Sequence, residues 1–523
     1  METPLSPLEF ARRALKLHAD REAVVDGELR FTYAQFLDRC DRASSALQSL
    51  GLGKGDRVAL ISPNTHTNLE MYYAAPQYGA VIVPINYRLT ADDFVYLINH
   101  SGSKIVCAHP DYFAAIDGIR DQLPDVTHFI ALEGAREGWL DYAHLVSTSS
   151  PNFERFPIAE TDLLSVNYTS GTTSRPKGVM ITHRNAWMNS VGVLVHMHMT
   201  PSDRYLWTLP MFHANGWTFI WTVTAVGGTH VCLRKVEPLA IYDHVNREGV
   251  TLLCAAPTVL IGIANGPEAQ RSAVRPGVRV ITAGAPPAPA TIERVEGELK
   301  WTITQAYGLT ETSPFITICE PLPAHAELTS EQRAKLKARQ GVELITSGET
   351  AVFDENDQPV PADGQTLGEI VARGNTVMRG YYNDPEASAK ALKGGWFRTG
   401  DAAVVHPDGY IEIRDRIKDV IISGGENISS IEVEAALLRH PAIVEVAVVG
   451  MPHEKWGESP EAFVVLRDGV ALTDGELKAF CRQNLAHFKV PTAFHVVLDL
   501  PKTATGKIQK FVLRGKRAAI ATQ

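Results

Sequence analysis

Short apolar runs rich in β-branched residues alternate with segments of helical periodicity along most of the chain. Residues 58–61, 104–108, 128–132, 252–255 and 278–283 have the length and composition of buried strands. Each lies between segments in which apolar residues recur every three or four positions. This alternation predicts parallel sheets covered by helices, which is an α/β architecture.

The pattern changes near residue 415, where residues 415–419 are highly charged. After a glycine turn at 423–425, the predicted elements are a capped helix from Ser429, strands at 443–449, 462–466 and 494–498, and a second capped helix from Thr473. We therefore expect a large N-terminal domain (residues 1–415), a hinge (416–419) and a small, mobile α+β domain (420–523). The alternative is that the charged segment is a surface turn inside one large domain.

Composition narrows the class of protein. The 523 residues are 45% hydrophobic and carry a formal net charge of −9, which argues against non-specific nucleic-acid binding. Six cysteines stand singly, without a Cys-x-x-Cys pair, which favours reduced thiols in the cytoplasm and no zinc site.

Targeting and membrane signals are not expected from the sequence. Charged residues interrupt the N-terminal segment, so we expect a short amphipathic helix there and no signal peptide. The most apolar stretch, residues 218–233, is too short and too broken by polar residues to span a membrane. The last three residues, 521–523, do not form a peroxisomal signal.

Residues 168–179 are the most informative stretch. They follow an apolar run and supply four hydroxyls, two glycines and Lys177, which suits a loop that wraps a polyphosphate. The loop is not of the Walker A type, because Pro176 precedes the lysine and disfavours a helix there. We expect Lys177 on an extended arm. A Ser/Thr/Gly-rich surface turn is the alternative interpretation.

Five further polar segments are weak signals individually. A carboxylate beside hydroxyls, as at Glu311, can hold Mg²⁺, small residues at a strand end can flank a base, and an aspartate after a turn can accept ribose hydroxyls. Ordinary turns, helix starts and core histidines are equally good explanations of each. The segments are residues 305–312, 283–287, 399–401, 501–508 and 211–217.

Taken in order along the chain, these segments resemble the adenylate-forming superfamily, which includes acyl-CoA synthetases, peptide-synthetase adenylation domains and beetle luciferases. The resemblance extends from residue 31 to Lys507, and the fatty-acyl and medium-chain acyl-CoA ligase branch is the most similar. The chain departs from the usual pattern at Ser174, Ile422 and Asn427, where related enzymes have glycine, lysine and tryptophan.

The resemblance implies a role for each matching position. The expected ATP-binding residues are Thr169, Ser170, Gly171, Thr172, Thr173, Lys177, Gly284, Ala285, Pro286, Gln305, Tyr307, Gly308, Thr310, Asp401, Arg416, Lys418 and Lys507. Among these, Lys507 and Thr310 are expected to be catalytic together with Glu311, and Thr169 and Glu311 to face Mg²⁺. His213 and Trp217 are expected at the acyl pocket, Ser423, Gly424 and Gly425 on the path of CoA, and Lys418 at the hinge.

The resemblance also implies the reaction. A carboxylic acid, expected to be a medium- or long-chain fatty acid, reacts with ATP to give acyl-adenylate and pyrophosphate, and CoA then displaces AMP. Alternatives are an aryl or cinnamoyl CoA ligase, an adenylation domain that loads a carrier protein, and a non-catalytic ATP or acyl-AMP sensor. The expected partners are the acid, ATP, Mg²⁺ and CoA, and a homodimer is left open.

Overall fold

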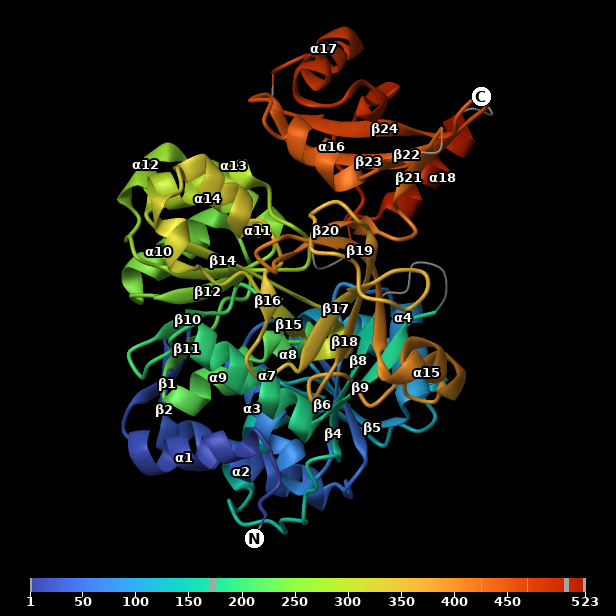
Figure 1. Ribbon diagram of the computed structural model, residues 1–523. Helices are drawn as coiled ribbons and strands as arrows, with labels where there is room; N and C mark the ends of the chain where they lie inside the picture. The colour runs from blue at the N-terminus through green and yellow to red at the C-terminus, as the bar shows by residue number, and fades with distance from the viewer. Residues whose placement is uncertain (1, 170–174, 425, 468, 503–507, 521–523) are drawn as a thin grey trace.

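Figure 1 shows a large N-terminal part on which a smaller C-terminal part is placed. The structure is a computed structural model that describes residues 2–169, 175–424, 426–467, 469–502 and 508–520. The expected fold class, a large α/β domain of helix-covered sheets followed by a small α+β domain, is confirmed. Within the described residues, no helix combines the length and the apolar character that crossing a bilayer requires.

The first large sheet has seven strands and is parallel except for its last pair, β8 and β9. Its strands, in spatial order, are β7 (Leu140–Asp141), β6 (His128–Ala131), β5 (Ser103–Ala108), β3 (Arg57–Ile61), β4 (Val81–Pro84), β8 (Leu163–Thr169) and β9 (Lys177–Thr182). The apolar runs at 58–61, 104–108 and 128–132 are thus central strands, as expected.

The second large sheet has nine strands, with a parallel centre and antiparallel pairs at both edges. In spatial order they are β16 (Val342–Glu343), β15 (Phe315–Ile318), β14 (Thr302–Gly308), β13 (Arg279–Thr282), β12 (Leu252–Ala255), β10 (Arg204–Leu206), β11 (Thr229–Val231), β1 (Glu22–Asp26) and β2 (Leu29–Thr32).

Helices cover both sheets. They are α1 (Leu8–His18), α2 (Tyr33–Ser49), α3 (His66–Ala74), α4 (Ala91–Ser101), α5 (Phe113–Asp117), α6 (Tyr142–Thr148), α7 (His183–His196), α8 (Ala214–Trp217), α9 (Phe219–Val226), α10 (Pro238–Arg247), α11 (Pro257–Asn265), α12 (Glu268–Ala273), α13 (Pro289–Arg294), α14 (Ser330–Lys337) and α15 (Pro385–Ala391). Several begin at a residue whose side chain accepts a backbone N–H, as Thr32 does for α2.

The main hydrophobic core lies between the two large sheets. Val58 and Leu60 of β3 face it, whereas Ala59 and Ile61 face a second cluster on the opposite side, as the alternation of side chains in a strand requires. The shared core also contains Tyr205 of the nine-stranded sheet and buried residues of α2, α3 and α9. All six cysteines are buried and free.

Two smaller sheets complete the fold. An antiparallel sheet contains β17 (Glu349–Phe353), β18 (Gly368–Arg373), β19 (Phe397–Val405) and β20 (Ile411–Arg416). The C-terminal sheet contains β22 (Glu426–Ile428), β21 (Ile421–Ser423), β24 (Gly457–Leu466), β23 (Ile443–His453) and β25 (Ala493–Val496), with α16 (Ser430–Leu437), α17 (Asp474–Asn484) and α18 (Lys510–Ile520). The capped starts predicted at Ser429 and Thr473 are both confirmed.

Candidate active site

The predicted phosphate loop joins β8 to β9 at the edge of the seven-stranded sheet. These strands pair antiparallel, and Thr169 lies opposite Lys177. A Cβ atom on Gly178 would lie 2.8 Å from Cγ1 of Val166, so this position requires glycine for close packing. Lys177 therefore stands on an extended strand, as expected, while Ser170, Gly171, Thr172 and Thr173 lie outside the described residues.

A chain of polar contacts links Tyr307, Asp401 and Arg416. The Tyr307 hydroxyl donates to Oδ2 of Asp401 at 2.7 Å, and Nε of Arg416 lies 2.8 Å from Oδ1 of the same carboxylate. Burial lowers the pKa of Arg416, but the surrounding negative charges, of which Asp401 contributes most, together outweigh burial and raise the pKa. Residues from β14, β19 and β20 thus hold one buried carboxylate in a fixed orientation.

Glu311 lies just beyond β14, in a single 3₁₀ turn (Thr310–Thr312). Desolvation by the surrounding protein raises the pKa of its carboxyl group, against the opposing effects of a hydrogen bond from Tyr381 and the positive charge of Arg416. Its backbone carbonyl accepts from the Met378 N–H at 2.7 Å. Glu311 is therefore electrostatically connected to the Tyr307–Asp401–Arg416 chain.

Tyr381 joins Glu311 to Lys177, and its role was missed in the sequence. Its hydroxyl donates to Oε1 of Glu311 at 3.0 Å, and the Lys177 ammonium lies 4.9 Å from the centre of its ring. The backbone at Tyr381 also bridges to Val179 of β9. Since Tyr381 is far from both partners in the sequence, only the adjacent Gly380, with φ of +145°, gives a local sign of an unusual backbone there.

The expected base-flanking segment follows β13. Gly284 has φ of +91°, and a Cβ atom there would meet no neighbour, so its exposed face is open. Register pairs Thr282 with Gln305, which places this turn beside the end of β14. Gly308, at that end, approaches the Pro314 carbonyl so closely that a Cβ would lie 1.8 Å from its oxygen. Gly284, Ala285 and Pro286 thus lie near Tyr307, as the resemblance implies.

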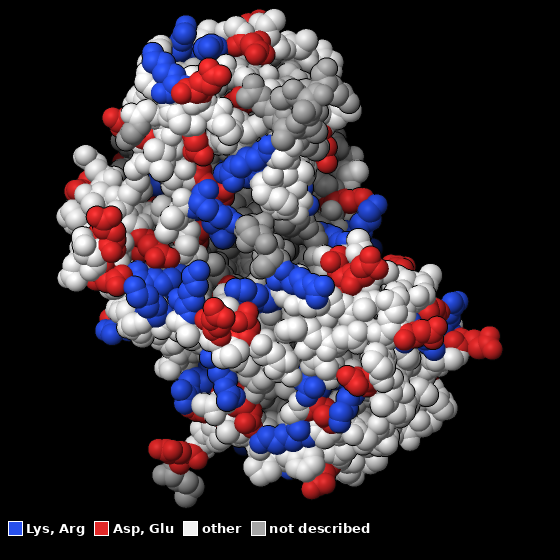
Figure 2. All heavy atoms as spheres, turned by 90° about the vertical axis from the view of Figure 1, so that its right-hand side faces the viewer, with Lys and Arg blue, Asp and Glu red and all other residues white. Residues whose placement is uncertain are grey.

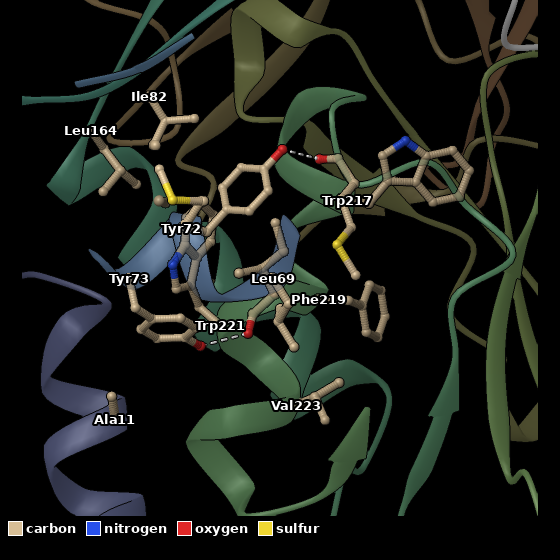
Figure 3. Packing of buried hydrophobic residues seen from close by; sticks show 14 of the residues in the cluster. Ala11, Leu69, Tyr72, Tyr73, Ile82, Leu164, Trp217, Phe219, Trp221 and Val223 are labelled. Carbon is tan, nitrogen blue, oxygen red and sulfur yellow. Dashed lines mark hydrogen bonds between the residues drawn. The ribbon is translucent and has the colours of Figure 1, made fainter. Parts of the chain in front are cut away.

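The expected acyl-pocket residues lie on and beside α8. Trp217 is only 3% exposed, and its ring centre is 5.3 Å from that of Phe315 in an edge-to-face arrangement. The His213 ring lies 6.5 Å from the Trp217 ring. Figure 3 shows Trp217 in the same buried hydrophobic cluster as Tyr72, Phe219 and Trp221.

The expected CoA residues lie in the C-terminal part. Ser423 ends β21, and Gly424 has φ of +60° and donates its N–H to the Trp456 carbonyl at 2.8 Å. A Cβ atom on Gly424 would lie 2.8 Å from the Trp456 ring, so glycine allows this close approach. Gly425 and the predicted catalytic lysine, Lys507, lie outside the described residues.

Positive charge borders the space between the two parts of the molecule. Figure 2 shows Lys and Arg side chains around a hollow between the C-terminal part and the rest of the chain. An electropositive hollow attracts anions and raises their local concentration. This face of the molecule is therefore suited to attract a negatively charged ligand.

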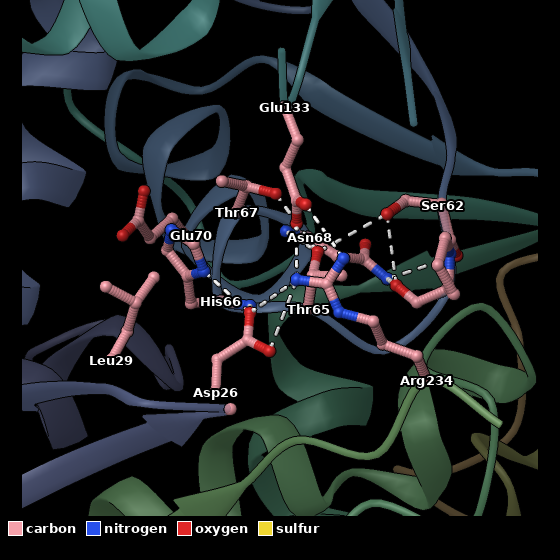
Figure 4. A network of polar contacts seen from close by, with 12 residues as sticks. Asp26, Leu29, Ser62, Thr65, His66, Thr67, Asn68, Glu70, Glu133 and Arg234 are labelled. Atoms are coloured by element: carbon pink, nitrogen blue, oxygen red, sulfur yellow. Dashed lines mark hydrogen bonds and ion pairs between the residues drawn. The ribbon is translucent and has the colours of Figure 1, made fainter. Parts of the chain in front are cut away.

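A separate polar cluster contains Asp26, His66 and Glu133, whose donor atoms are close enough together for a metal ion. Figure 4 shows Arg234 reaching into this cluster. Its guanidinium lies 2.8 Å from Oε2 of Glu133 and 3.4 Å from Asp26, and His66 Nδ1 lies 2.7 Å from Oδ2 of Asp26. Because arginine already supplies the positive charge, the cluster is an ion network that joins the two large sheets.

Comparison with models of known protein families shows to which family the chain belongs. The model of the AMP-binding enzyme family matches residues 10–382, and that of the AMP-binding enzyme C-terminal domain matches residues 432–507. The chain belongs to the AMP-binding enzyme family. The predicted adenylate-forming superfamily, and with it an enzyme of the acyl-CoA synthetase class, is therefore confirmed.

Named relatives of this AMP-binding enzyme cover nearly its whole length. It is 44% identical to 4-hydroxybutyrate–CoA ligase 2 of Metallosphaera sedula, over 99% of this chain and 96% of the relative, and 38% identical to the peroxisomal trans-cinnamate:CoA ligase of Petunia hybrida, over 98% and 94%. Among solved structures, the anthranilate CoA ligase AuaEII in complex with anthranoyl-AMP matches with a TM-score of 0.90 and 25% identity, over 100% of both chains.

The AMP-binding enzyme thus gathers predicted residues from distant parts of the sequence. One group contains Lys177 and Glu311 with Tyr381 between them, and the other contains Tyr307, Asp401 and Arg416. The Glu311 carboxylate and the Thr169 hydroxyl are oxygen ligands of the kind that Mg²⁺ prefers. Glu311 and Thr169 are the residues that would hold it.

Replacement of Tyr381 by phenylalanine is expected to weaken ATP binding about tenfold or more, because a hydrogen bond to a charged group contributes roughly 1.5–3 kcal/mol. The ring, and with it the contact to Lys177, is retained. ATP affinity measured calorimetrically with and without Mg²⁺ checks the expectation, and the loss should be larger with Mg²⁺. Tyr382→Phe is the control, since it removes a neighbouring hydroxyl; equal behaviour of both variants would contradict the role of Tyr381.

Proposed function

We propose that this AMP-binding enzyme joins a short carboxylic acid to CoA in two steps. In the first step the acid attacks the α-phosphorus of ATP and releases pyrophosphate, leaving acyl-adenylate. In the second step the CoA thiolate attacks the acyl carbonyl, and AMP leaves with the electron pair of the broken bond. The observation that carries this proposal is that Tyr381 contacts both Lys177 and Glu311, while Asp401 and Arg416 act electrostatically on Glu311.

The described residues divide the first step among them. Lys177 and Thr169 lie opposite each other on β9 and β8, which form a hairpin around the predicted phosphate loop. Both suit the β- and γ-phosphates. Asp401, oriented by Tyr307 and Arg416, suits the two ribose hydroxyls as an acceptor. Thr310 is proposed at the α-phosphate. Because Gly284 has no side chain, it leaves a surface on which adenine can lie beside Tyr307. Mg²⁺, held by Glu311 and Thr169, would neutralise charge on the triphosphate.

A short acid is favoured by the packing around Trp217. The indole is almost fully buried, and its ring packs edge-to-face on Phe315. A medium- or long-chain fatty acid, the expectation from the sequence, would require this pair of rings to separate if its chain passes between them. The relative with 44% identity is named for a four-carbon acid, which supports the same choice.

The aromatic alternative has its own support. An edge-to-face pair such as Trp217 and Phe315 can border a flat slot, and two of the matched proteins are named for cinnamate and anthranilate. An aryl acid is therefore the second candidate for the substrate.

A reducing compartment such as the cytoplasm is proposed on the six free, buried thiols.

A panel of acids tests the proposal. Acyl-CoA and AMP are measured with straight-chain acids from two to twelve carbons, with 4-hydroxybutanoate, and with benzoate and cinnamate. We expect kcat/KM to rise about fourfold per added methylene up to four or five carbons and then to fall, since each buried methylene contributes about 0.8 kcal/mol. A rise that continues beyond eight carbons would favour the fatty-acid alternative. No acyl-CoA from any acid would contradict the proposed function.

A further inference from the structure

The turn that bears Trp217 has a left-handed backbone. The φ angles of Ala214, Asn215, Gly216, Trp217 and Thr218 are +37°, +48°, +55°, +48° and +66°. Left-handed backbone is unfavourable for residues other than glycine because the Cβ atom crowds a carbonyl oxygen, so it normally occurs at single residues. Five consecutive residues in this region require that the surroundings impose the conformation.

The chain on both sides of this turn is tied down by buried hydrogen bonds. The Met211 N–H donates to Oδ1 of Asn64, and its carbonyl accepts from the Tyr72 hydroxyl, both at 2.9 Å. On the other side, the Thr222 hydroxyl donates to the Thr218 carbonyl at 2.9 Å. The segment before the turn is thus held by Asn64 and Tyr72, while the bond after the turn is local to the start of α9.

A closed ring of side-chain hydrogen bonds holds the turn itself. The Ser165 hydroxyl donates to Oδ1 of Asn167 at 2.7 Å, Nδ2 of Asn167 donates to Oδ1 of Asn215 at 3.2 Å, and Nδ2 of Asn215 donates to the Ser165 hydroxyl at 2.6 Å. Nδ2 of Asn167 also donates to the Phe212 carbonyl at 3.2 Å. All three ring members are at most 2% exposed, so a broken ring would leave buried polar atoms without partners.

Gly216 adds a steric constraint next to the ring. A Cβ atom on Gly216 would lie 2.5 Å from the Trp207 ring, so the turn packs directly on that indole. Trp207 is itself fully buried and donates its indole N–H to His230 at 3.2 Å. The hydrogen-bonded ring and the contact between Gly216 and Trp207 both constrain the turn. Together they leave the Trp217 side chain little freedom relative to Phe315.

We propose that the Ser165–Asn167–Asn215 ring is a specificity device, which fixes the left-handed turn so that Trp217 stays against Phe315 and limits the length of the acid. The inference rests on the proposed function, because Trp217 limits an acid only if the enzyme binds one. The three ring members are positioning residues, since they act through Trp217 and not on the reacting atoms.

The hydrogen-bonded ring of Ser165, Asn167 and Asn215 is attached to the same strand as the predicted phosphate loop. Ser165 and Asn167 lie two residues apart on β8 and therefore face the same side of the strand, and β8 continues directly to Thr169 at the phosphate hairpin. The turn that limits the acid and the hairpin proposed for ATP are thus built on one strand. Such a shared support suits a reaction in which a carboxylate and a phosphate must meet in a fixed geometry.

Ser165→Ala opens the ring with a minimal change of volume. The measured quantity is the ratio of kcat/KM for the preferred acid to kcat/KM for the acid two methylenes longer, together with KM for ATP and the Tm. We expect this ratio to fall by about fivefold or more, out of the roughly 15-fold that two methylenes can contribute. KM for ATP should stay unchanged. Ser44→Ala is the matched control, because Ser44 is another fully buried serine, in α2, whose hydroxyl bonds only outside the site.

Asn215→Gly provides an independent test in case Ser165→Ala fails to fold. Glycine adopts positive φ without a steric penalty, so this variant keeps the turn accessible but removes the ring. We expect the same loss of selectivity as in Ser165→Ala. Wild-type selectivity in either folded variant, or an equal loss of kcat/KM for all acids, would overturn the proposal. If the unmodified enzyme activates no acid, the proposed function fails first, which distinguishes the two failures.

Discussion

Replacing Lys507 by alanine is expected to slow acyl-adenylate formation by about 10²–10³-fold, the effect of removing one charge contact made in a transition state. Lys507 lies in the matched AMP-binding enzyme C-terminal domain, and the resemblance assigns it to the meeting of carboxylate and α-phosphate. Two unit negative charges about 4 Å apart repel by about 4 kcal/mol at an effective dielectric constant of 20. An ammonium group between them converts this repulsion into attraction.

The two half-reactions separate this role from a general loss of structure. Thioester formation from supplied acyl-adenylate and CoA should proceed normally in Lys507→Ala, because the two anions no longer need to meet. Lys502→Ala is the control, since it removes an ammonium that is already paired with Glu445 at 2.7 Å. If Lys507→Ala slowed both half-reactions equally, the proposed bridging role would be wrong.

The second large effect is expected for Lys418→Pro, which should leave adenylation intact and slow the CoA step about 10²-fold or more, the scale expected when reacting groups are misplaced. Lys418 lies between β20 and β21, the segment predicted as a hinge. Just before it, Ile417 donates its N–H to Gly400 at 3.0 Å, and Asp419 and Val420 both donate to the Arg416 carbonyl. Proline fixes φ near −65°, so a rotation at this position would be blocked.

Lys418→Ala is the matched control for the hinge, because it removes the ammonium and leaves φ free. We expect this variant to form the thioester at close to the normal rate, and any contribution of the Lys418 ammonium to ATP binding to appear only as a higher KM for ATP. Rates of pyrophosphate release and of thioester formation, measured separately, give the comparison, and the Tm verifies that the turn has survived. Unchanged thioester formation in Lys418→Pro would refute the assignment of residues 416–419 as the hinge.

Local patterns in the sequence predicted the regular elements well. Apolar runs identified the central strands β3, β5, β6, β12 and β13, because strands buried on both faces have short, continuous apolar sequences. Ser429 and Thr473 marked helix starts because their side chains accept backbone N–H groups. Lys177 begins β9, so the extended conformation expected at this lysine is confirmed.

Contacts between distant residues were beyond such patterns. Tyr381 meets Lys177 and Glu311 only because the chain returns beside β9, and no spacing in the sequence records that return. The left-handed turn at 214–218 contains a single glycine and would not be expected from local preferences. Its conformation depends on Ser165 and Asn167, about fifty residues earlier, so it follows from tertiary packing.

The central claim is that the enzyme activates its acid as an adenylate before CoA takes part. Exchange of labelled pyrophosphate into ATP, measured with Mg²⁺ and each acid of the panel but without CoA, tests this most directly. We expect exchange that requires the acid and is strongly reduced in Lys507→Ala. Acyl-CoA formation by the unmodified enzyme with no acid-dependent exchange in the absence of CoA would contradict it.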